Sequence, residues 1–152
     1  MHIIIGSDHA AFEVKASIIE QLQAKGHTVE DVGTHSVESC DYPDVAFTAG
    51  AALQKAIATD PGSRGILLCG SGIGMSIAAN KIPGIYAALA TDVYMAAQGV
   101  EHDNANVLVL AARVSSEPDM HAMVDAFLNA SFLNEEKYVR RFKKVVDYEQ
   151  SV

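Results

Sequence analysis

The sequence contains no tryptophan, only two cysteines and no long run of basic residues. Cys40 and Cys69 stand far apart in the 152-residue chain and form no CxxC pair. A disulfide framework is therefore not expected, and free thiols are typical of a reducing cytoplasm, where we expect the protein to act. The formal net charge is −8, and Lys and Arg form no continuous run. This charge balance argues against a nucleic-acid partner.

No segment has the composition of a membrane span or of a secretory signal. The apolar runs are far shorter than the ~18 residues that a membrane span requires. Met1 is followed by HIIIGSDHAAF, which contains neither a basic n-region nor a small-residue cleavage site. The sequence also lacks an H-x-x-x-H motif and any Cys/His cluster. We therefore expect no membrane partner, no secretion signal and no metal site.

Short apolar runs alternate with longer segments of helical spacing along the whole chain. The apolar runs predict strands at 2–5, 28–32, 65–69, 85–90 and 107–111. The spacing predicts helices at about 10–25, 42–58, 74–81, 92–99, 117–130 and 134–148. Because the strands are almost continuously apolar, both faces of their sheet must be covered. The pattern predicts an α/β fold with a single domain over 1–152, a Rossmann-like doubly wound sheet of about five parallel strands with helices on both faces.

Polar and reactive residues follow several of the predicted strands. Sheets of this kind bind ligands beyond the carboxyl ends of their strands, so we expect these residues to meet in one crevice. They are Asp8 and His9 after the first strand, the segment 69–74 after the third, His102 and Asp103 beside the fifth, and Arg113 after it.

The segment CGSGIG, residues 69–74, places a thiol directly before three alternating glycines. Gly70, Gly72 and Gly74 let the backbone approach a ligand closely, and successive N–H groups at a helix N-terminus suit an anion. That anion could be a phosphate or an enediolate. The spacing G-x-G-x-G matches neither the dinucleotide fingerprint nor a P-loop, so we expect no nucleotide cofactor.

Cys69 and two histidines are the candidates for chemistry. A helix N-terminus favours a thiolate, which can remove a proton from carbon, but a buried structural cysteine is the more common meaning of a cysteine that ends an apolar strand. No Cys-His-Asn signature supports a nucleophile. His9 follows a strand, and His102 stands among Glu101, Asp103 and Asn104. An imidazole there could protonate or deprotonate a sugar oxygen, or serve only a structural role.

Four segments occur in the order seen in type B ribose-5-phosphate isomerases, which the chain resembles over nearly its whole length. These segments are Gly6-Ser7-Asp8-His9 with Phe12, Asp41-Tyr42-Pro43, ILLCGSGIGMSIAANK at 66–81, and the stretch from His102 to Val107. The wider family includes allose-6-phosphate and galactose-6-phosphate isomerases. The resemblance implies interconversion of ribose 5-phosphate and ribulose 5-phosphate without a metal or organic cofactor. It also implies a homodimer, or a tetramer of dimers, whose active sites are built from both subunits.

The resemblance also implies a role for individual residues. His102 would open the furanose ring, Cys69 would move the proton from C2 to C1 through a cis-enediolate, and Ser71 would assist the proton shuttle between the oxygens. The residues implied in substrate binding are Gly70, Gly72, Ile73 and Gly74 for the enediolate, Asp8 and Asp103 for the sugar, and His9, Arg113, Lys137 and Arg141 for the phosphate.

Two segments depart from the usual pattern of that family. The chain reads His102-Asp103-Asn104 where His-Asn-Asp is usual, and Lys137-Tyr138 where Arg-His is usual. An ionised Asp103 accepts hydrogen bonds but does not donate them, and Lys137 lacks the bidentate fork of arginine. An isomerase for another sugar phosphate and a non-catalytic sugar-phosphate binder therefore remain alternatives. The basic C-terminal helix could contribute to the dimer or simply present a solvated face.

Overall fold

The computed structural model describes all 152 residues, and its five strands form one parallel sheet. The strands are β1 (His2–Ser7), β2 (Thr28–Asp31), β3 (Arg64–Cys69), β4 (Ala87–Leu89) and β5 (Val107–Ala111). Their order across the sheet is β2-β1-β3-β5-β4. The predicted Rossmann-like α/β fold is confirmed.

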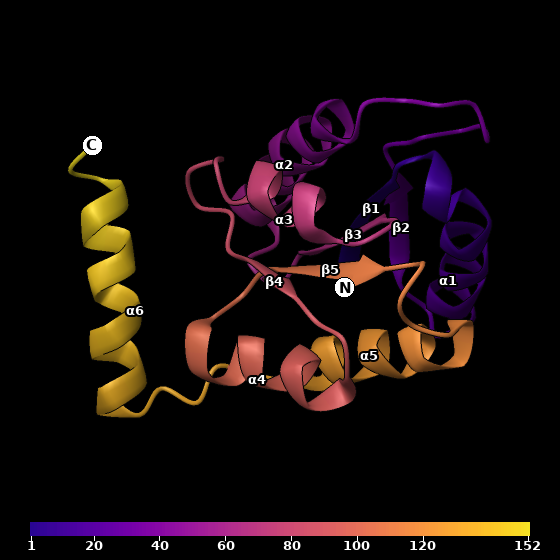
Figure 1. Ribbon diagram of the computed structural model, residues 1–152. Helices are drawn as coiled ribbons and strands as arrows, with labels where there is room; N and C mark the ends of the chain where they lie inside the picture. The colour runs from indigo at the N-terminus through magenta and orange to yellow at the C-terminus, as the bar shows by residue number, and fades with distance from the viewer.

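Helices cover both faces of this sheet, as Figure 1 shows. They are α1 (Phe12–Ala24), α2 (Tyr42–Thr59), α3 (Ile73–Ala79), α4 (Val93–Asp103), α5 (Glu117–Asn129) and α6 (Glu136–Glu149), with a short 3₁₀ helix, η1 (His9–Ala11), before α1. Helices α2 and α3 pack on one face, and α1, α4 and α5 pack on the other. None of the helices is both long enough and apolar enough to cross a membrane.

The side chains of the central strands alternate between two separate cores. Ile3 and Ile5 of β1 pack with α1, α4 and α5, whereas Ile4 packs with α2 and α3. In β3, Leu68 lies in the first core and Cys69 in the second. Successive residues of a strand point to opposite faces, so a strand that is covered on both sides must be apolar throughout.

The predicted end of the fourth helix at Gly99 is wrong, because α4 continues to Asp103. Gly99 lies in the helix interior, where an added Cβ would stand 3.0 Å from the Cβ of Ala88. The glycine therefore allows α4 to pack closely on β4 and does not end the helix. The helix ends where Asn104 adopts a left-handed conformation with φ 52°. His102 and Asp103 consequently lie in the last turn of α4 and not in a loop.

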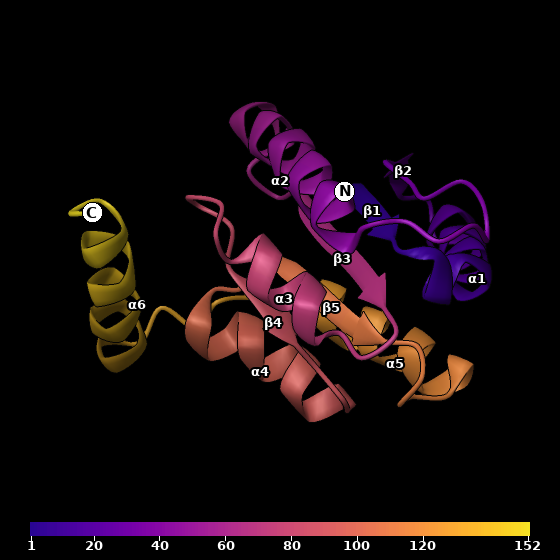
Figure 2. The same cartoon turned by 45° about the horizontal axis from the view of Figure 1, so that its top comes forward.

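Helix α6 stands apart from the rest of the molecule (Figures 1 and 2). It packs mainly against α4, and Tyr138 is its only buried residue. At its C-terminal end, the Glu149 carboxylate accepts hydrogen bonds from the Gly84 N–H and the Tyr86 hydroxyl, each at 3.1 Å. The carboxyl end of β5 points away from α6 in Figure 1, so α6 lies beyond the amino edge of the sheet.

Candidate functional site

A cavity of about 290 Å³ lies at the carboxyl edge of the sheet, where the polar residues were expected. Seven of the predicted residues line it: Asp8 and His9 after β1, Cys69, Gly70, Ser71 and Gly74 around the end of β3, and Arg113 after β5. The parallel arrangement of β1, β3 and β5 brings these segments together, because parallel strands end at the same edge.

Cys69 is the last residue of β3, and its side chain is almost completely enclosed, with 5% exposed. The Gly72 N–H donates a hydrogen bond to Cys69 Sγ at 3.1 Å. Ser71, which is exposed, lies on the same turn, and its Oγ accepts from the Ile73 N–H at 3.4 Å. The turn therefore presents a thiol, a hydroxyl and backbone donors to one small volume, as proton transfer next to a developing negative charge requires.

A neighbouring side chain closely approaches each glycine of this turn. Gly72 has φ +76°, and an added Cβ would stand 2.3 Å from Leu89 Cδ1. At Gly74 the added Cβ would meet the Tyr42 ring at 2.6 Å, and at Gly70 it would meet Arg113 Cδ at 3.2 Å. The backbone is thus accessible to Tyr42 and Arg113 because side chains are absent there.

The side chains of His9 and Asp8 each accept a hydrogen bond from a backbone N–H group. The Cys40 N–H donates to His9 Nδ1 at 3.3 Å, so a neutral His9 carries its proton on Nε2. One oxygen of Asp8 accepts from the Ala10 N–H at 2.9 Å and caps η1. Analysis of the sequence missed the Cys40 contact and the lining role of Tyr42, although Tyr42 stands in the Asp41-Tyr42-Pro43 segment.

Six other predicted residues do not line this cavity: Gly72 and Ile73 lie on the same turn, and the other four lie elsewhere. The expectation that His102 and Asp103 meet the strand-end residues in one crevice is therefore wrong for a single chain. His102 and Asp103 lie in the last turn of α4, while Lys137 and Arg141 lie on α6. The crossover helix α4 returns from the carboxyl edge to the amino edge of the sheet, and it carries His102 with it (Figure 1).

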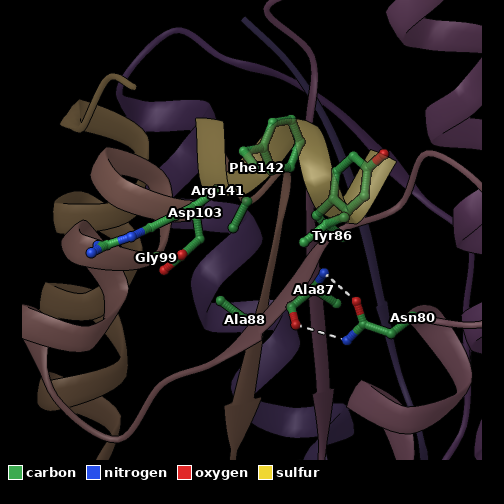
Figure 3. A pocket seen from close by; sticks show the side chains of 10 residues that line it. Asn80, Tyr86, Ala87, Ala88, Gly99, Asp103, Arg141 and Phe142 are labelled. Atoms are coloured by element: carbon green, nitrogen blue, oxygen red, sulfur yellow. Dashed lines mark hydrogen bonds between the residues drawn. The ribbon is translucent and has the colours of Figure 1, made fainter. Parts of the chain in front are cut away.

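Asp103 and Arg141 line a second cavity, of about 360 Å³, between β4, α4 and α6. Figure 3 shows both residues on one side of this cavity and Tyr86 on the other, with Asn80 bonded to the Ala87 backbone below. Tyr86 packs edge-on against Phe142 at 4.8 Å between ring centroids. Two of the residues predicted to bind substrate, Asp103 and Arg141, therefore lie at a cavity between α4 and α6.

Lys137 and Arg141 are both exposed on α6. Lys137 Nζ pairs with Glu135 at 3.0 Å. The hydrogen bond to Glu135, and after it the neighbouring Tyr138, raise the pKa of Lys137 above its ordinary value. Lys137 therefore stays a cation throughout the neutral range. No group of three or more His, Cys, Asp and Glu side chains in the structure is arranged to hold a metal ion.

Comparison with known proteins identifies the family of isomerases to which this arrangement belongs. The family described as Ribose/Galactose Isomerase matches residues 3–145. The chain is 40% identical over 152 residues to a ribose-5-phosphate isomerase B of Mycobacterium tuberculosis, covering 99% of this chain and 91% of that relative. The chain therefore belongs to this family, and the resemblance to type B ribose-5-phosphate isomerases is confirmed.

Solved structures of the same class superpose over the whole molecule. The ribose-5-phosphate isomerase B of Clostridium thermocellum gives a TM-score of 0.93 at 40% identity and covers 99% of both chains. The enzyme of Mycoplasma genitalium, solved with bound ribulose 5-phosphate, gives a TM-score of 0.93 at 38% identity and covers 99% of this chain and 97% of its own.

Proposed function

We propose that this protein interconverts ribose 5-phosphate and ribulose 5-phosphate through a cis-enediolate, with Cys69 as the base. The observation that carries the proposal is the enclosed Cys69 thiol, with the Gly72 N–H on its sulfur at 3.1 Å, in a cavity shared with Asp8, His9 and Arg113. The bound ribulose 5-phosphate of the Mycoplasma genitalium relative supports the choice of substrate.

In the proposed reaction, His102 opens the furanose ring and the open-chain aldose lies against the glycine turn. The Cys69 thiolate takes the proton from C2, and the electron pair of that C–H bond forms the C1–C2 double bond of the enediolate. Backbone N–H groups of the turn stabilise the charge that develops on oxygen. Ser71 then relays the hydroxyl proton from O2 to O1, and Cys69 returns its proton to C1, which gives the ketose.

Binding of the phosphate is assigned to His9, Arg113, Lys137 and Arg141. Nε2 of a neutral His9 carries a proton that can be donated to a phosphate oxygen, because Nδ1 already accepts from Cys40. Arg113 lies over Gly70 at the cavity, and its backbone N–H donates to the Gly70 carbonyl at 2.9 Å. Asp8, at the cavity wall, accepts from the sugar hydroxyls.

A second copy of the chain completes this site in our proposal. The last turn of α4 and helix α6, which carry His102, Lys137 and Arg141, lie toward the amino edge of the sheet. The Cys69 cavity lies at the carboxyl edge, so one chain does not bring them together. Two observations support a homodimer. Helix α6 stands away from its own domain, and α3 exposes Ile73 and Ile77 beside the glycine turn. Exposed apolar side chains on neighbouring turns are typical of a surface that another subunit covers.

The first test measures formation of ribulose 5-phosphate from ribose 5-phosphate in a buffer containing a chelator. Cys69→Ala should lower kcat by at least ~10²-fold, because the general base is removed. Cys40→Ala is the matched control, since this second free cysteine does not line the cavity and its hydrogen bond to His9 comes from the backbone N–H, which alanine keeps. An active Cys69→Ala variant would refute the assignment of the base.

The second test concerns the shared site and uses two inactive variants. Cys69→Ala and His102→Ala, coexpressed in equal amounts, should give about a quarter of wild-type activity, because random pairing in a two-fold dimer restores one complete site in half of the dimers. If the coexpressed pair stays inactive although the variants form mixed dimers, the shared site is wrong and the isomerase assignment is unaffected.

An isomerase for another sugar phosphate is the alternative that one observation favours. Asp103 lines the same cavity as Arg141, so its carboxylate lowers the positive charge available to a phosphate and offers a different set of hydrogen bonds to the sugar. Relative kcat/KM values for ribose 5-phosphate, allose 6-phosphate and galactose 6-phosphate distinguish the two. The highest value for ribose 5-phosphate would exclude this alternative, and tight binding without turnover would favour a non-catalytic binder.

A further inference from the structure

The His102 ring is held by two side chains that lie outside the residues assigned so far. Gln98 stands one turn earlier in α4, and its amide nitrogen lies 3.1 Å from His102 Nδ1. Tyr138 of α6 stacks on the imidazole, with 4.1 Å between ring centroids and 13° between the planes. Tyr138 is 8% exposed and is the only buried residue of its helix. The imidazole is therefore restrained both at its face and at one nitrogen.

We propose that Tyr138 and Gln98 are positioning residues that present His102 Nε2, and not Nδ1, to the sugar. This inference rests on the proposed function, in which His102 opens the furanose ring. The stack with Tyr138 fixes the plane of the imidazole. The contact with Gln98 occupies Nδ1, which leaves Nε2 as the one ring nitrogen without a partner in the chain.

The amide of Gln98 suits this task in either charge state of the imidazole. Its NH₂ group donates to an unprotonated Nδ1, and after rotation its carbonyl oxygen accepts from a protonated one. Nδ1 therefore stays occupied when the histidine gains or loses a proton. The ring keeps one orientation while Nε2 exchanges protons with the substrate, as a positioned acid or base requires.

The stack also links the ring-opening group to the phosphate-binding helix. Tyr138 lies between Lys137 and Arg141 in α6, and Lys137 Nζ stands 4.6 Å from the centroid of the Tyr138 ring. Because α6 packs mainly against α4, this aromatic contact sets the position of one helix relative to the other. A sugar phosphate whose phosphate is bound by α6 thus has its ring placed relative to His102 by Tyr138.

The test compares Tyr138→Leu with Tyr138→Phe, which keeps an aromatic ring. Tyr138→Leu should lower kcat for ribose 5-phosphate by ~10–100-fold, since a small misplacement of a reacting group has an effect of this size. In the NMR spectrum, the His102 ring protons should lose the upfield shift that a stacked aromatic ring causes. Tyr138→Phe should retain both the turnover and the shift. Tyr148→Leu is the matched control, because Tyr148 is 70% exposed on the same helix.

Three results would overturn the inference, and they separate it from the proposed function. Wild-type kcat in Tyr138→Leu, alongside an inactive His102→Ala, would show that the stack does not position the catalytic ring. An absent upfield shift in the wild type would show that the stack itself does not form. Wild-type kcat in His102→Ala would refute the ring-opening role, and with it this inference.

Gln98→Leu provides a second variant that leaves the stack in place. It should change the ¹⁵N shift of His102 Nδ1 and lower kcat several-fold, while the upfield shift of the ring protons stays as in the wild type. Unchanged Nδ1 shift and kcat in Gln98→Leu would refute the role of Gln98. This variant also keeps the inference testable if Tyr138→Leu fails to fold.

Discussion

Lys15 is a cation that is almost completely buried, and the two members of its ion pair should respond differently to replacement. Its side chain is 2% exposed, and Nζ lies 2.5 Å from Asp31 Oδ1 and 2.7 Å from the Thr34 carbonyl oxygen. The Asp31 side chain is 30% exposed and also accepts from the Gly33 N–H at 2.9 Å. Water can therefore reach the anion but not the cation.

Asp31→Asn leaves a buried ammonium without its counter-charge, and breaking a buried pair in this way costs ~3–5 kcal/mol. Lys15→Met removes the charge and keeps an unbranched chain of similar length. The remaining Asp31 carboxylate keeps the Gly33 N–H and gains water, so the loss should be ~1–3 kcal/mol. We expect Asp31→Asn to be less stable than Lys15→Met by about 2 kcal/mol, or about 1 M in the urea midpoint.

Urea unfolding at pH 7 measures both variants, and one fixed protein concentration makes their midpoints comparable if the subunits associate. The double variant Lys15→Met/Asp31→Asn should be at least as stable as Asp31→Asn alone, since it no longer buries an unpaired charge. Equal midpoints for the two single variants, or a lower midpoint for Lys15→Met, would refute the reasoning from unequal exposure.

Three further predictions test the turn, the end of α6 and the start of α4. Gly72→Ala should lower the free energy of unfolding by at least ~1–3 kcal/mol, because φ is +76° and the new Cβ would meet Leu89. The variant should also lose most of the turnover. A wild-type melting temperature would contradict this. Burial, and after it Glu149, raise the pKa of Tyr86 to about 12. Folding therefore favours the neutral phenol, stability should fall as pH rises from about 10 to 12, and Tyr86→Phe should reduce that fall in urea titrations. Asp92→Ala should lower the free energy of unfolding by ~1 kcal/mol, because the Asp92 side chain caps α4. Asp92→Asn should keep most of this stability in thermal unfolding, since asparagine can also cap a helix.

The apolar pattern was sufficient to predict the sheet and most of its helices. Strands such as 107–111 are buried on both faces, so their local composition reports their burial directly. The helix that contains Gly99 was predicted too short because a glycine often marks a helix end. Here the glycine serves tight packing against Ala88, a neighbour on another element that no local pattern reveals.

The order of strands and loops along the chain is enough to predict the reactive set at the carboxyl edge of the sheet. Asp8 directly follows β1 and Cys69 is the last residue of β3, and parallel strands bring the residues at their carboxyl ends to one edge. The position of His102 at the opposite edge, stacked on Tyr138 and apart from the thiol, is evident only from the folded structure. The reason is that the direction of α4 and the docking of α6 depend on contacts between distant parts of the chain. The order of strands and loops, in contrast, can be predicted from short local patterns of apolar and polar residues.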